Sequence, residues 1–490
     1  MVEVTMLFNT YGFMLLFLPV FLVAFFIIRA FVQDQIKKEA ALNILIILAS
    51  FVFYSFFGVR NTAVLCISLI INIIIIYRIG KSKKKKAWLI AGIAFNVVLL
   101  SFFKFSGLFF PVAISFYTFN QISYVIDLYR GEIKEFDIPD YLVYILFFPK
   151  LLQGPLEGFG SFDAGIKKAY EEELDWEKMM RGLLLLSMGL FKKVILADTF
   201  AKAVEYGFSA IPNLGRMEAI LTAVFYSFQL YFDFSGYCDV ATAICMMMGF
   251  DLATNFNSPY KATDIDDFWN RWHMTLTGFF TKYVYIPLGG NRKGRVRTYI
   301  NVLIVFLISG IWHGSGLTFI IWGAAHGVMS VLTKMVKNAR KEKKEAKDNK
   351  AVKIFAAVRK AAAVLGNYIF IMATWVFFRA ETVSDAIGLF VRMAVGGPKP
   401  FYSTFADGFR LDEIWYIIKV TPIMNYNFAW DLCLWLFLAA AVIIIFFGKN
   451  AIRFCRECKI NMGTTLLTAF LLLWSIISFS GVSTYLYMNF

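Results

Sequence analysis

The sequence predicts an all-α, polytopic membrane protein: about eleven transmembrane helices, with short re-entrant or interfacial helices between them. Three observations support this fold class. Of the 490 residues, 59% are hydrophobic and only 17% are charged, whereas soluble domains are near half apolar and a quarter charged. Apolar stretches that can span a bilayer recur along the whole chain. Basic clusters separate several of them, which is typical of cytoplasmic loops.

The hydrophobic segments follow one another in a single series. Several are too short to cross a bilayer and are expected to be re-entrant or buried. The first is interpreted as a permanent helix, because Met1 to Met6 carries no Lys or Arg and no cleavage pattern follows. No long repeat interrupts the series, so we expect one membrane domain over residues 1–490. The segments cover about 7–28, 41–57, 62–77, 87–103, 108–127, 141–152, 180–196, 217–249, 299–313, 317–333, 361–378, 429–447 and 463–480.

The net charge of +15 is concentrated in loops, which argues against nucleic-acid binding. Residues 334–360 hold eleven Lys or Arg against three acids, and so supply +8 of the +15. We predict that this segment is a basic cytosolic loop, because Lys and Arg accumulate on the cytoplasmic side of membrane proteins. The basic loops 29–40, 78–86, 289–298 and 449–459 then also lie in the cytosol, while both termini lie outside.

The six cysteines show no disulfide framework. Cys455 and Cys458 form a CxxC pair, but the second pair or nearby histidines that a zinc site needs are missing. We therefore expect reduced thiols in a cytosolic loop, and no metal site.

All three histidines of the chain lie within a short stretch, and each is a candidate functional residue. His313 follows an apolar run and stands among small residues in Ser309–Gly316. If the helix begins at the basic loop near Arg297, His313 lies roughly 24 Å along it, most of the way across a core about 30 Å thick. We expect it at a hairpin tip inside the membrane, where an ionisable side chain is a functional candidate by default.

His273 and His326 have weaker local signals. Trp269, Trp272 and Leu276 recur at helical spacing around His273, which predicts an amphipathic interfacial helix. His273 is then either functional or a hydrogen-bonded residue at a helix contact. His326 lies about three and a half turns beyond His313, where a supporting role is expected.

Two acids stand in another apolar run. Asp233 and Asp239 belong to the stretch Gln229–Asp239. Buried carboxylates need partners, so these side chains either shape a substrate cavity or bond a neighbouring helix. GxSxG, P-loop and HExxH motifs are absent.

Several stretches together resemble the membrane-bound O-acyltransferase family, in the branch that includes the alginate O-acetylation membrane protein. The resemblance covers most of the chain, in family order. It rests on Pro111–Arg130, Phe147–Pro155, Tyr231–Asp239, Asn255–Tyr260, Phe268–Leu276, Tyr285–Gly294, Ile311–Gly314 and Phe377–Ala380.

The resemblance implies helices around a central funnel or tunnel, with His313 and His273 as catalytic residues. His313 would act as general base on the accepting hydroxyl, and His273 would orient the thioester or hold the oxyanion. The expected substrate-binding residues are Asp233, Asp239, Trp269, Arg271, Trp272, Arg292, Lys293 and His326. Arg292 and Lys293, with Arg295 and Arg297, would attract the phosphates of the donor.

The implied activity is acyl transfer across a bacterial cell membrane onto an extracellular or cell-wall polysaccharide. The donor is expected to be acetyl-coenzyme A or another cytosolic acyl thioester, with no bound cofactor. An extracytoplasmic SGNH-type acetyltransferase is the expected partner, beside the lipid bilayer and the polysaccharide acceptor. Two alternatives stay open: teichoic-acid D-alanylation from a carrier-protein thioester, and a non-enzymatic transporter or flippase.

Overall fold

The computed structural model describes residues 6–341, 350–398, 403–422, 426, 429–479 and 485–486. The regular elements of these ranges are helices, which confirms the all-α fold class. The chain divides into two compact units. The first unit comprises residues 1–194, 234–254 and 451–490, and the second comprises 195–233 and 255–450. The prediction of a single membrane domain over 1–490 stays a prediction.

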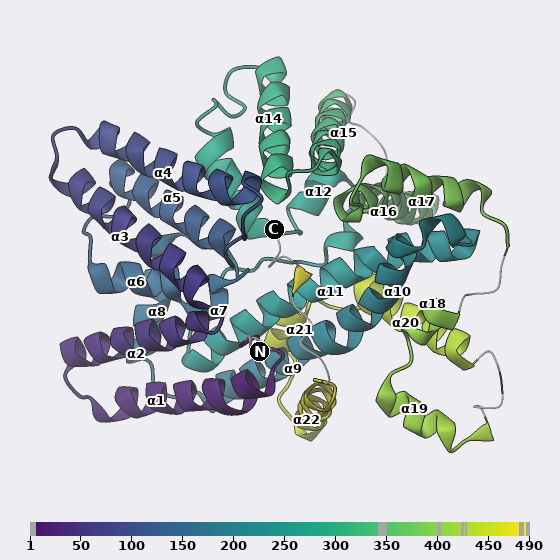
Figure 1. The fold of residues 1–490 in the computed structure, drawn as a ribbon, viewed down its shortest axis with the longest axis horizontal. Coiled ribbons are helices and arrows are strands. Elements are labelled where there is room, and N and C mark those ends of the chain that lie inside the picture. Colours follow the sequence, from purple (N-terminus) through teal and green to yellow (C-terminus); the bar gives the residue numbers. More distant parts are fainter. Residues whose placement is uncertain are drawn as a thin grey trace. The chain divides into compact units, whose positions relative to one another are not determined.

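The first unit begins with a series of antiparallel apolar helices (Figure 1). Some of the polar residues on these helices are buried and hydrogen-bonded to one another. Asn72 and Asn96 are fully buried and exchange side-chain hydrogen bonds of 2.8 and 3.3 Å between α3 and α4. Such paired amides hold apolar helices in register. The helices are η1 (Gly12–Phe17), α1 (Leu18–Phe31), α2 (Gln35–Ser55), α3 (Val59–Lys81), α4 (Lys85–Phe105), α5 (Ile114–Arg130), α6 (Ile138–Leu146), α7 (Phe148–Leu151), α8 (Phe159–Glu171), α9 (Trp176–Leu190), α21 (Ala451–Glu457) and α22 (Met462–Ile477).

The second unit carries the three histidines. Two helices, η2 (Phe191–Ala197) and α11 (Arg216–Met248), run from one unit into the other along the chain. The remaining helices of this unit are α10 (Asp198–Ser209), η3 (Ile211–Asn213), η4 (Pro259–Lys261), α12 (Ile265–Trp269), α13 (Met274–Phe280), η5 (Thr281–Tyr285), α14 (Arg295–His313), α15 (Leu317–Lys341), α16 (Lys350–Arg379), α17 (Val383–Val395), α18 (Ser403–Asp407), α19 (Asp412–Lys419), α20 (Ala429–Val442) and η7 (Ile443–Phe447).

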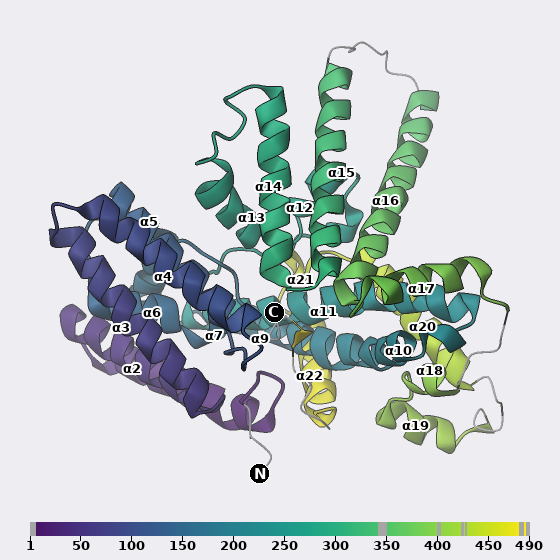
Figure 2. The same ribbon diagram turned by 45° about the horizontal axis from the view of Figure 1, so that its top comes forward.

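Helices α14 and α15 form a tightly packed hairpin (Figure 2). Glycines make the close approach possible. A Cβ atom on Gly310 would lie 2.6 Å from the Phe319 carbonyl oxygen, and one on Gly323 would lie 2.5 Å from that of Phe306. Gly323 and Gly327 form a small-xxx-small pair on α15, the pattern that lets membrane helices pack backbone to backbone.

Seven described helices are long and apolar enough to cross a membrane: Gly12–Phe31, Val59–Lys81, Lys85–Phe105, Arg295–His313, Leu317–Ala339, Ala356–Arg379 and Ala429–Phe447. The hydropathy pattern had suggested about eleven. The difference arises partly because apolar stretches such as 141–152 are divided between short helices, here α6 and α7. The multi-pass architecture itself is confirmed.

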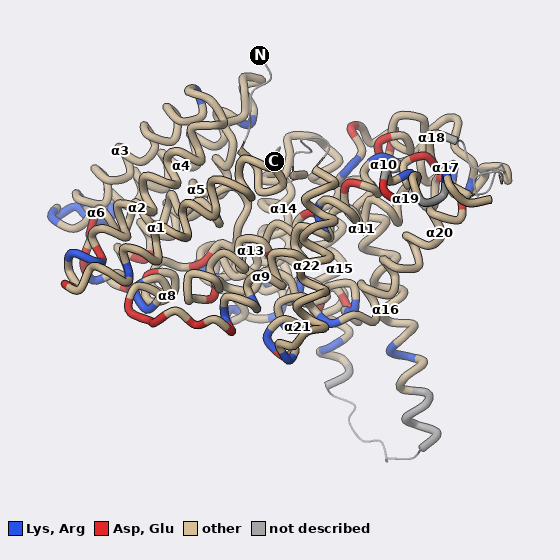
Figure 3. Tube along the Cα trace, turned by 90° about the horizontal axis from the view of Figure 1, so that it is seen from below, with Lys and Arg blue, Asp and Glu red and all other residues tan. Residues whose placement is uncertain are grey.

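The described parts of the basic segment 334–360, which was expected to be a loop, are helical. Helix α15 continues to Lys341 and α16 begins at Lys350, while residues 342–349 lie outside the described ranges. The segment is rich in Ala, Lys, Glu and Arg, which are among the best helix formers. Figure 3 shows Lys and Arg where α15 ends and α16 begins.

Candidate active site

His313 is the last residue of α14 and stands at the tip of the α14–α15 hairpin, as predicted. Its side chain is buried, with an exposure of 3%. The imidazole lies against three aromatic rings, with centroid distances of 4.4 Å to Trp312, 5.0 Å to Trp322 and 5.1 Å to Phe378. Helix α14 has 19 residues, so it rises roughly 28 Å from the basic loop to His313.

His326 lies inside the same hairpin, with both ring nitrogens bonded to protein groups. The indole N–H of Trp269 donates to Nδ1 of His326 at 3.3 Å. Because Nδ1 accepts, Nε2 carries the proton and donates to Thr374 Oγ1 at 2.9 Å. The Thr374 hydroxyl in turn donates to the Ile371 carbonyl at 2.8 Å. This chain of bonds defines a neutral ring that holds Trp269 in place. The expected supporting role of His326 stays a prediction.

His273 is held in a strained conformation between α12 and α13. Its backbone has φ 44°, one of three positive values outside glycine among the described residues, and such strain is typical of functional sites. Asn255 compensates for it. The Asn255 carbonyl accepts from Met274 N at 3.0 Å. Its side-chain oxygen accepts from Thr275 N at 3.3 Å and lies 3.1 Å from His273 Nδ1.

These bonds determine the tautomer of His273. Because a backbone N–H donates to Oδ1 of Asn255, that atom is the amide oxygen, and His273 Nδ1 must donate to it. The neutral ring then carries its lone pair on Nε2. Burial lowers the pKa of His273 to about 3, so the ring is neutral at physiological pH. A neutral ring in this tautomer offers an acceptor at Nε2, which does not fit the expected role of holding an oxyanion.

The amphipathic helix predicted around His273 is broken in two. Helix α12 ends at Trp269 and α13 begins at Met274. The prediction of a continuous helix was wrong because the segment Asn255–Asn257 hydrogen-bonds to the break, with Asn257 N donating to the Arg271 carbonyl at 2.8 Å. Helical periodicity in sequence carries no information about that long-range contact.

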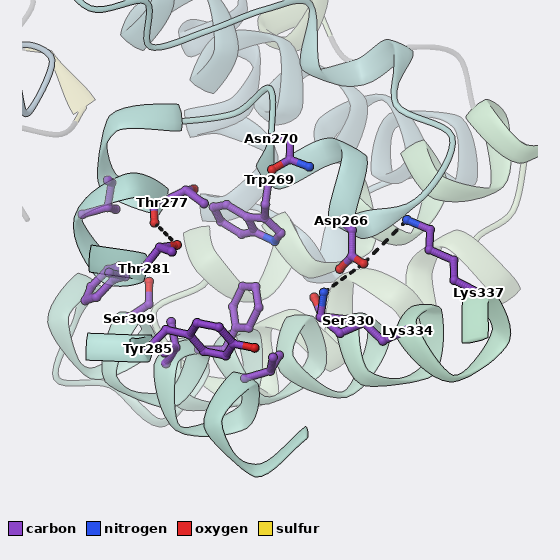
Figure 4. A pocket seen from close by; sticks show the side chains of 15 residues that line it. Asp266, Trp269, Asn270, Thr277, Thr281, Tyr285, Ser309, Ser330, Lys334 and Lys337 are labelled. Carbon is purple, nitrogen blue, oxygen red and sulfur yellow. Dashed lines mark hydrogen bonds and ion pairs between the residues drawn. The ribbon is translucent and has the colours of Figure 1, made fainter. Parts of the chain in front are cut away.

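A cavity of roughly 400 Å³ lies beside these elements (Figure 4). It is mostly apolar, with Trp269, Phe280, Val302 and Phe306 among its lining residues. The charged groups gather at one end, where Lys334 pairs with Asp266 at 3.0 Å and Lys337 lies 3.6 Å from the same carboxylate. An apolar cavity with a few convergent polar groups is the usual form of a small-molecule site.

Sequence spacing relates this cavity to two of the histidines. Ser309 lines it and lies one helical turn before His313 on α14. Ser330 lines it and lies one turn after His326 on α15. Trp269 forms part of the wall and donates its hydrogen bond to His326 behind it. The cavity, the hairpin and the two histidines therefore belong to one structural neighbourhood within the second unit.

Of the other residues expected to bind substrate, Trp272 and Arg271 have clear structural contacts. Trp272 is buried, with ring centroids 5.0 Å from Phe256 and 5.2 Å from Trp375. Arg271 donates from Nε to Asp267 at 2.7 Å. Arg292 and Lys293 are exposed in the turn before α14 and are not among the described residues that line the cavity. Substrate contacts of these residues stay predictions.

That turn is shaped by glycines. Gly289, Gly290 and Gly294 have φ values of 108°, 55° and 88°, which side chains with a Cβ rarely adopt. Asn301 on α14 donates to the Gly290 carbonyl at 2.9 Å. The motif Tyr285–Gly294 therefore encodes a defined turn, whatever its basic residues bind.

Asp233 and Asp239 occupy different compact units although they lie on one helix. Both are buried. Asp239 forms an ion pair with Lys192 at 2.5 Å, with both side chains less than a tenth exposed. Removing one partner of such a buried pair typically costs about 3 to 5 kcal/mol. Of the two alternatives for these acids, a substrate cavity or a bond to a neighbouring helix, Asp239 thus has the bond.

Several residues of this site were not singled out from the sequence. Asn255 was part of a family motif, but its contact with His273 joins residues 18 positions apart. Thr374, Asp266, Lys334 and Lys337 gave no local signal for a site. A residue that bonds a functional side chain across the fold is recognisable only once the helices are assembled.

Comparison with known proteins shows the family of this chain. A family model described as MBOAT, membrane-bound O-acyltransferase family, matches residues 46–376, about two-thirds of the chain, including His273, His313 and His326. The chain belongs to the membrane-bound O-acyltransferase family. It is a multi-pass O-acyltransferase of the bacterial inner membrane, which removes the transporter alternative.

Among the relatives of this acyltransferase, a peptidoglycan O-acetyltransferase of Helicobacter pylori is 36% identical over 428 residues, 78% of each chain. A probable alginate O-acetylase of Pseudomonas fluorescens is 34% identical over 393 residues, 78% of this chain and 74% of that one. A teichoic acid D-alanyltransferase of Bacillus subtilis is 28% identical over 255 residues, 50% of this chain and 65% of that one.

Proposed function

We propose that this acyltransferase takes an acetyl group from a cytosolic thioester, acetyl-coenzyme A, and passes it across the membrane for O-acetylation of a polysaccharide. The observation that carries the proposal is His313 at the buried tip of α14, one turn beyond a residue of an apolar cavity with charged groups at one end. Such a cavity suits the acyl chain and thioester, with Lys334 and Lys337 near the polar part of the donor.

The reaction follows from the roles of the two histidines. His313 takes the proton of the accepting hydroxyl as that oxygen attacks the thioester carbonyl. The carbon–sulfur bond breaks, an ester forms, and the proton is returned to the leaving thiolate. His273 has its lone pair on Nε2, so it accepts a hydrogen bond from an N–H or O–H group of one reactant. It therefore orients that reactant rather than stabilising the oxyanion.

The acceptor is a cell-wall or extracellular polysaccharide, in line with the named activities of the relatives from Helicobacter pylori and Pseudomonas fluorescens. We expect the acyl group to reach the sugar through an extracytoplasmic SGNH-type acetyltransferase. A second candidate is D-alanyl transfer from a carrier protein, supported by the similarity to teichoic acid D-alanyltransferases over half the chain.

The test uses purified protein in proteoliposomes. Radiolabelled acetyl-coenzyme A, or an acyl carrier protein thioester, is supplied on the side of the basic loops. Label is then measured on peptidoglycan fragments or alginate oligomers, with and without the partner transferase. We expect transfer from acetyl-coenzyme A. Transfer from the carrier protein alone would favour the second candidate, and no transfer from either donor would refute the proposal.

A further inference from the structure

A second cavity of the same unit lies between α15 and α16, toward the ends of the two helices that carry the basic segment 334–360. Its volume is roughly 530 Å³, within the range of small-molecule sites. It is separate from the cavity beside Trp269 described above. The two cavities share only one lining residue, Lys337. The residues that line it are Thr263, Asp264, Met329, Leu332, Thr333, Val336, Lys337, Ala356, Arg359, Lys360 and Ala363.

These residues are layered along the helix axes. On α15, Met329 and Leu332 are apolar, and Lys337 follows eight positions after Met329, roughly 12 Å further along the helix. On α16, Arg359 and Lys360 lie close to the end of the membrane span Ala356–Arg379, and Ala363 lies one turn deeper. The groove therefore has cations near the end of both spans and an apolar floor inside them.

The charge of the groove is predominantly positive. Asp264 is its one lining acid among the described residues, and it is paired with Lys337 at 2.8 Å. Arg359 and Lys360 are both exposed, and no acidic residue within the described ranges forms an ion pair with them. Arg359 and Lys360 thus place two exposed positive charges near the end of the membrane span, at the level where lipid headgroups lie.

We propose that this α15–α16 groove binds one anionic phospholipid from the cytosolic leaflet. Its phosphate lies at Arg359 and Lys360, and its acyl chain runs over Met329, Leu332 and Ala363. Basic pockets between membrane helices on the cytoplasmic side recognise anionic headgroups in this way. The apolar floor favours a lipid over a water-soluble anion, which would gain nothing from it. The inference does not depend on the donor or the acceptor of the acyl transfer.

The experiment is native mass spectrometry of the full-length protein in detergent, titrated with phosphatidylglycerol or with phosphatidylcholine. The double variant Arg359→Gln with Lys360→Gln removes both groove cations. Its matched control, Lys83→Gln with Lys84→Gln, removes two adjacent exposed cations from the α3–α4 turn. A third variant, Ala363→Phe, fills the apolar floor and leaves the charge unchanged.

We expect wild type to prefer phosphatidylglycerol. Each basic residue near an anionic surface is worth about a five-fold factor in affinity, so the groove double variant should bind it roughly 25-fold more weakly. The control pair should bind it nearly as wild type does, and Ala363→Phe should bind it more weakly than wild type while melting normally. Inorganic phosphate at millimolar concentration should not displace the lipid.

Equal losses in the groove variant and the control pair would show a general surface attraction and overturn the proposal. Displacement by inorganic phosphate would identify a simple anion site instead. If well-folded Ala363→Phe binds phosphatidylglycerol as wild type does, no acyl chain lies in the groove and the proposal is wrong.

Discussion

At the scale of single residues, the three histidines have different environments although they lie close together in sequence. His326 uses both ring nitrogens within the protein and holds Trp269. His273 is bound through Nδ1 to Asn255. His313 ends a helix among aromatic rings. Of the three, the chemistry assigned to His313 is the one that requires a proton to move.

Replacing His313 by Asn tests that role. Asn can hydrogen-bond but does not accept a proton at neutral pH, so acyl transfer should fall by about 10² to 10⁴. His326→Asn should lower the rate far less, and His273→Asn should fall between them. Rates are measured at saturating donor on purified proteins, with expression and melting temperature as controls, because a buried hydrogen bond lost at any of the three could cost about 1 to 3 kcal/mol. Near-normal acylation by well-folded His313→Asn would exclude this site.

The protonation of His273 predicts a pH dependence of stability. Burial lowers its pKa to about 3 in the folded protein, against about 6.5 in the unfolded chain. The unfolded state therefore binds the proton first, and stability contributed by the neutral ring is present above pH 6.5 and is lost as pH falls toward 3. Between pH 6.5 and 5 the loss is about 2 kcal/mol.

Thermal melting of wild type and His273→Gln across this pH range measures the effect. The melting temperature of wild type should fall more steeply with acidification than that of the variant. Parallel curves for the two proteins would contradict the neutral, buried imidazole.

At the scale of elements, the α14–α15 hairpin positions the site. Its glycines allow the two helices to approach, and the hairpin places His313 at its tip and His326 in its interior. The break between α12 and α13 adds His273 from a different part of the chain. Helix α14, helix α15 and the break between α12 and α13 thus each fix the position of one histidine through the backbone.

Gly323→Ala should destabilise the hairpin. The added methyl group would lie 2.5 Å from the Phe306 carbonyl oxygen, and overpacking of this kind typically costs about 1 to 3 kcal/mol. Gly366→Ala on α16 is the matched control, because a Cβ atom there meets nothing within 4 Å and alanine is up to about 1 kcal/mol better in a helix. Melting in detergent should show opposite shifts for the two variants. A harmless Gly323→Ala would mean that the helices are not this close.

The turn before α14 is expected to influence donor binding. Neutralising Arg292, Lys293, Arg295 and Arg297 together should raise the KM for the donor, most strongly at low ionic strength, where surface charges are less screened. Neutralising a similar number of lysines in the α3–α4 turn is the control. If the donor KM is the same for both sets at every salt concentration, the cluster serves topology alone.

At the scale of the whole molecule, orientation in the membrane follows from the basic segments. The positive-inside pattern places residues 334–360 in the cytosol and Phe490 outside. Reporter fusions at Asn349 and after Phe490 test this assignment. We expect a cytosolic signal from the first and an extracytoplasmic signal from the second. Matching cytosolic signals from both positions would reverse the assignment of the C-terminal end.

Sequence alone was sufficient for the fold class, the family and the helix that ends at His313. These depend on composition, on hydropathy over single segments and on short motifs, all of which are local properties of the chain. The hairpin tip could be placed because helix length converts directly into distance. Local patterns predicted the number of spans less well where one apolar stretch is divided between short helices, as it is between α6 and α7. They also predicted a loop where basic residues continue a helix, as in α15.

Only the tertiary structure decided the surroundings of each histidine. The segment Asn255–Asn257 bonds to the backbone where a helix predicted as continuous is broken. The side chain of Asn255 sets which ring nitrogen of His273 holds the lone pair. Trp269 and Thr374 hydrogen-bond to the two ring nitrogens of His326, and Lys192 forms an ion pair with Asp239. Each of these contacts joins residues distant in sequence, and a hydrogen bond or ion pair depends on positions in space that no local pattern encodes.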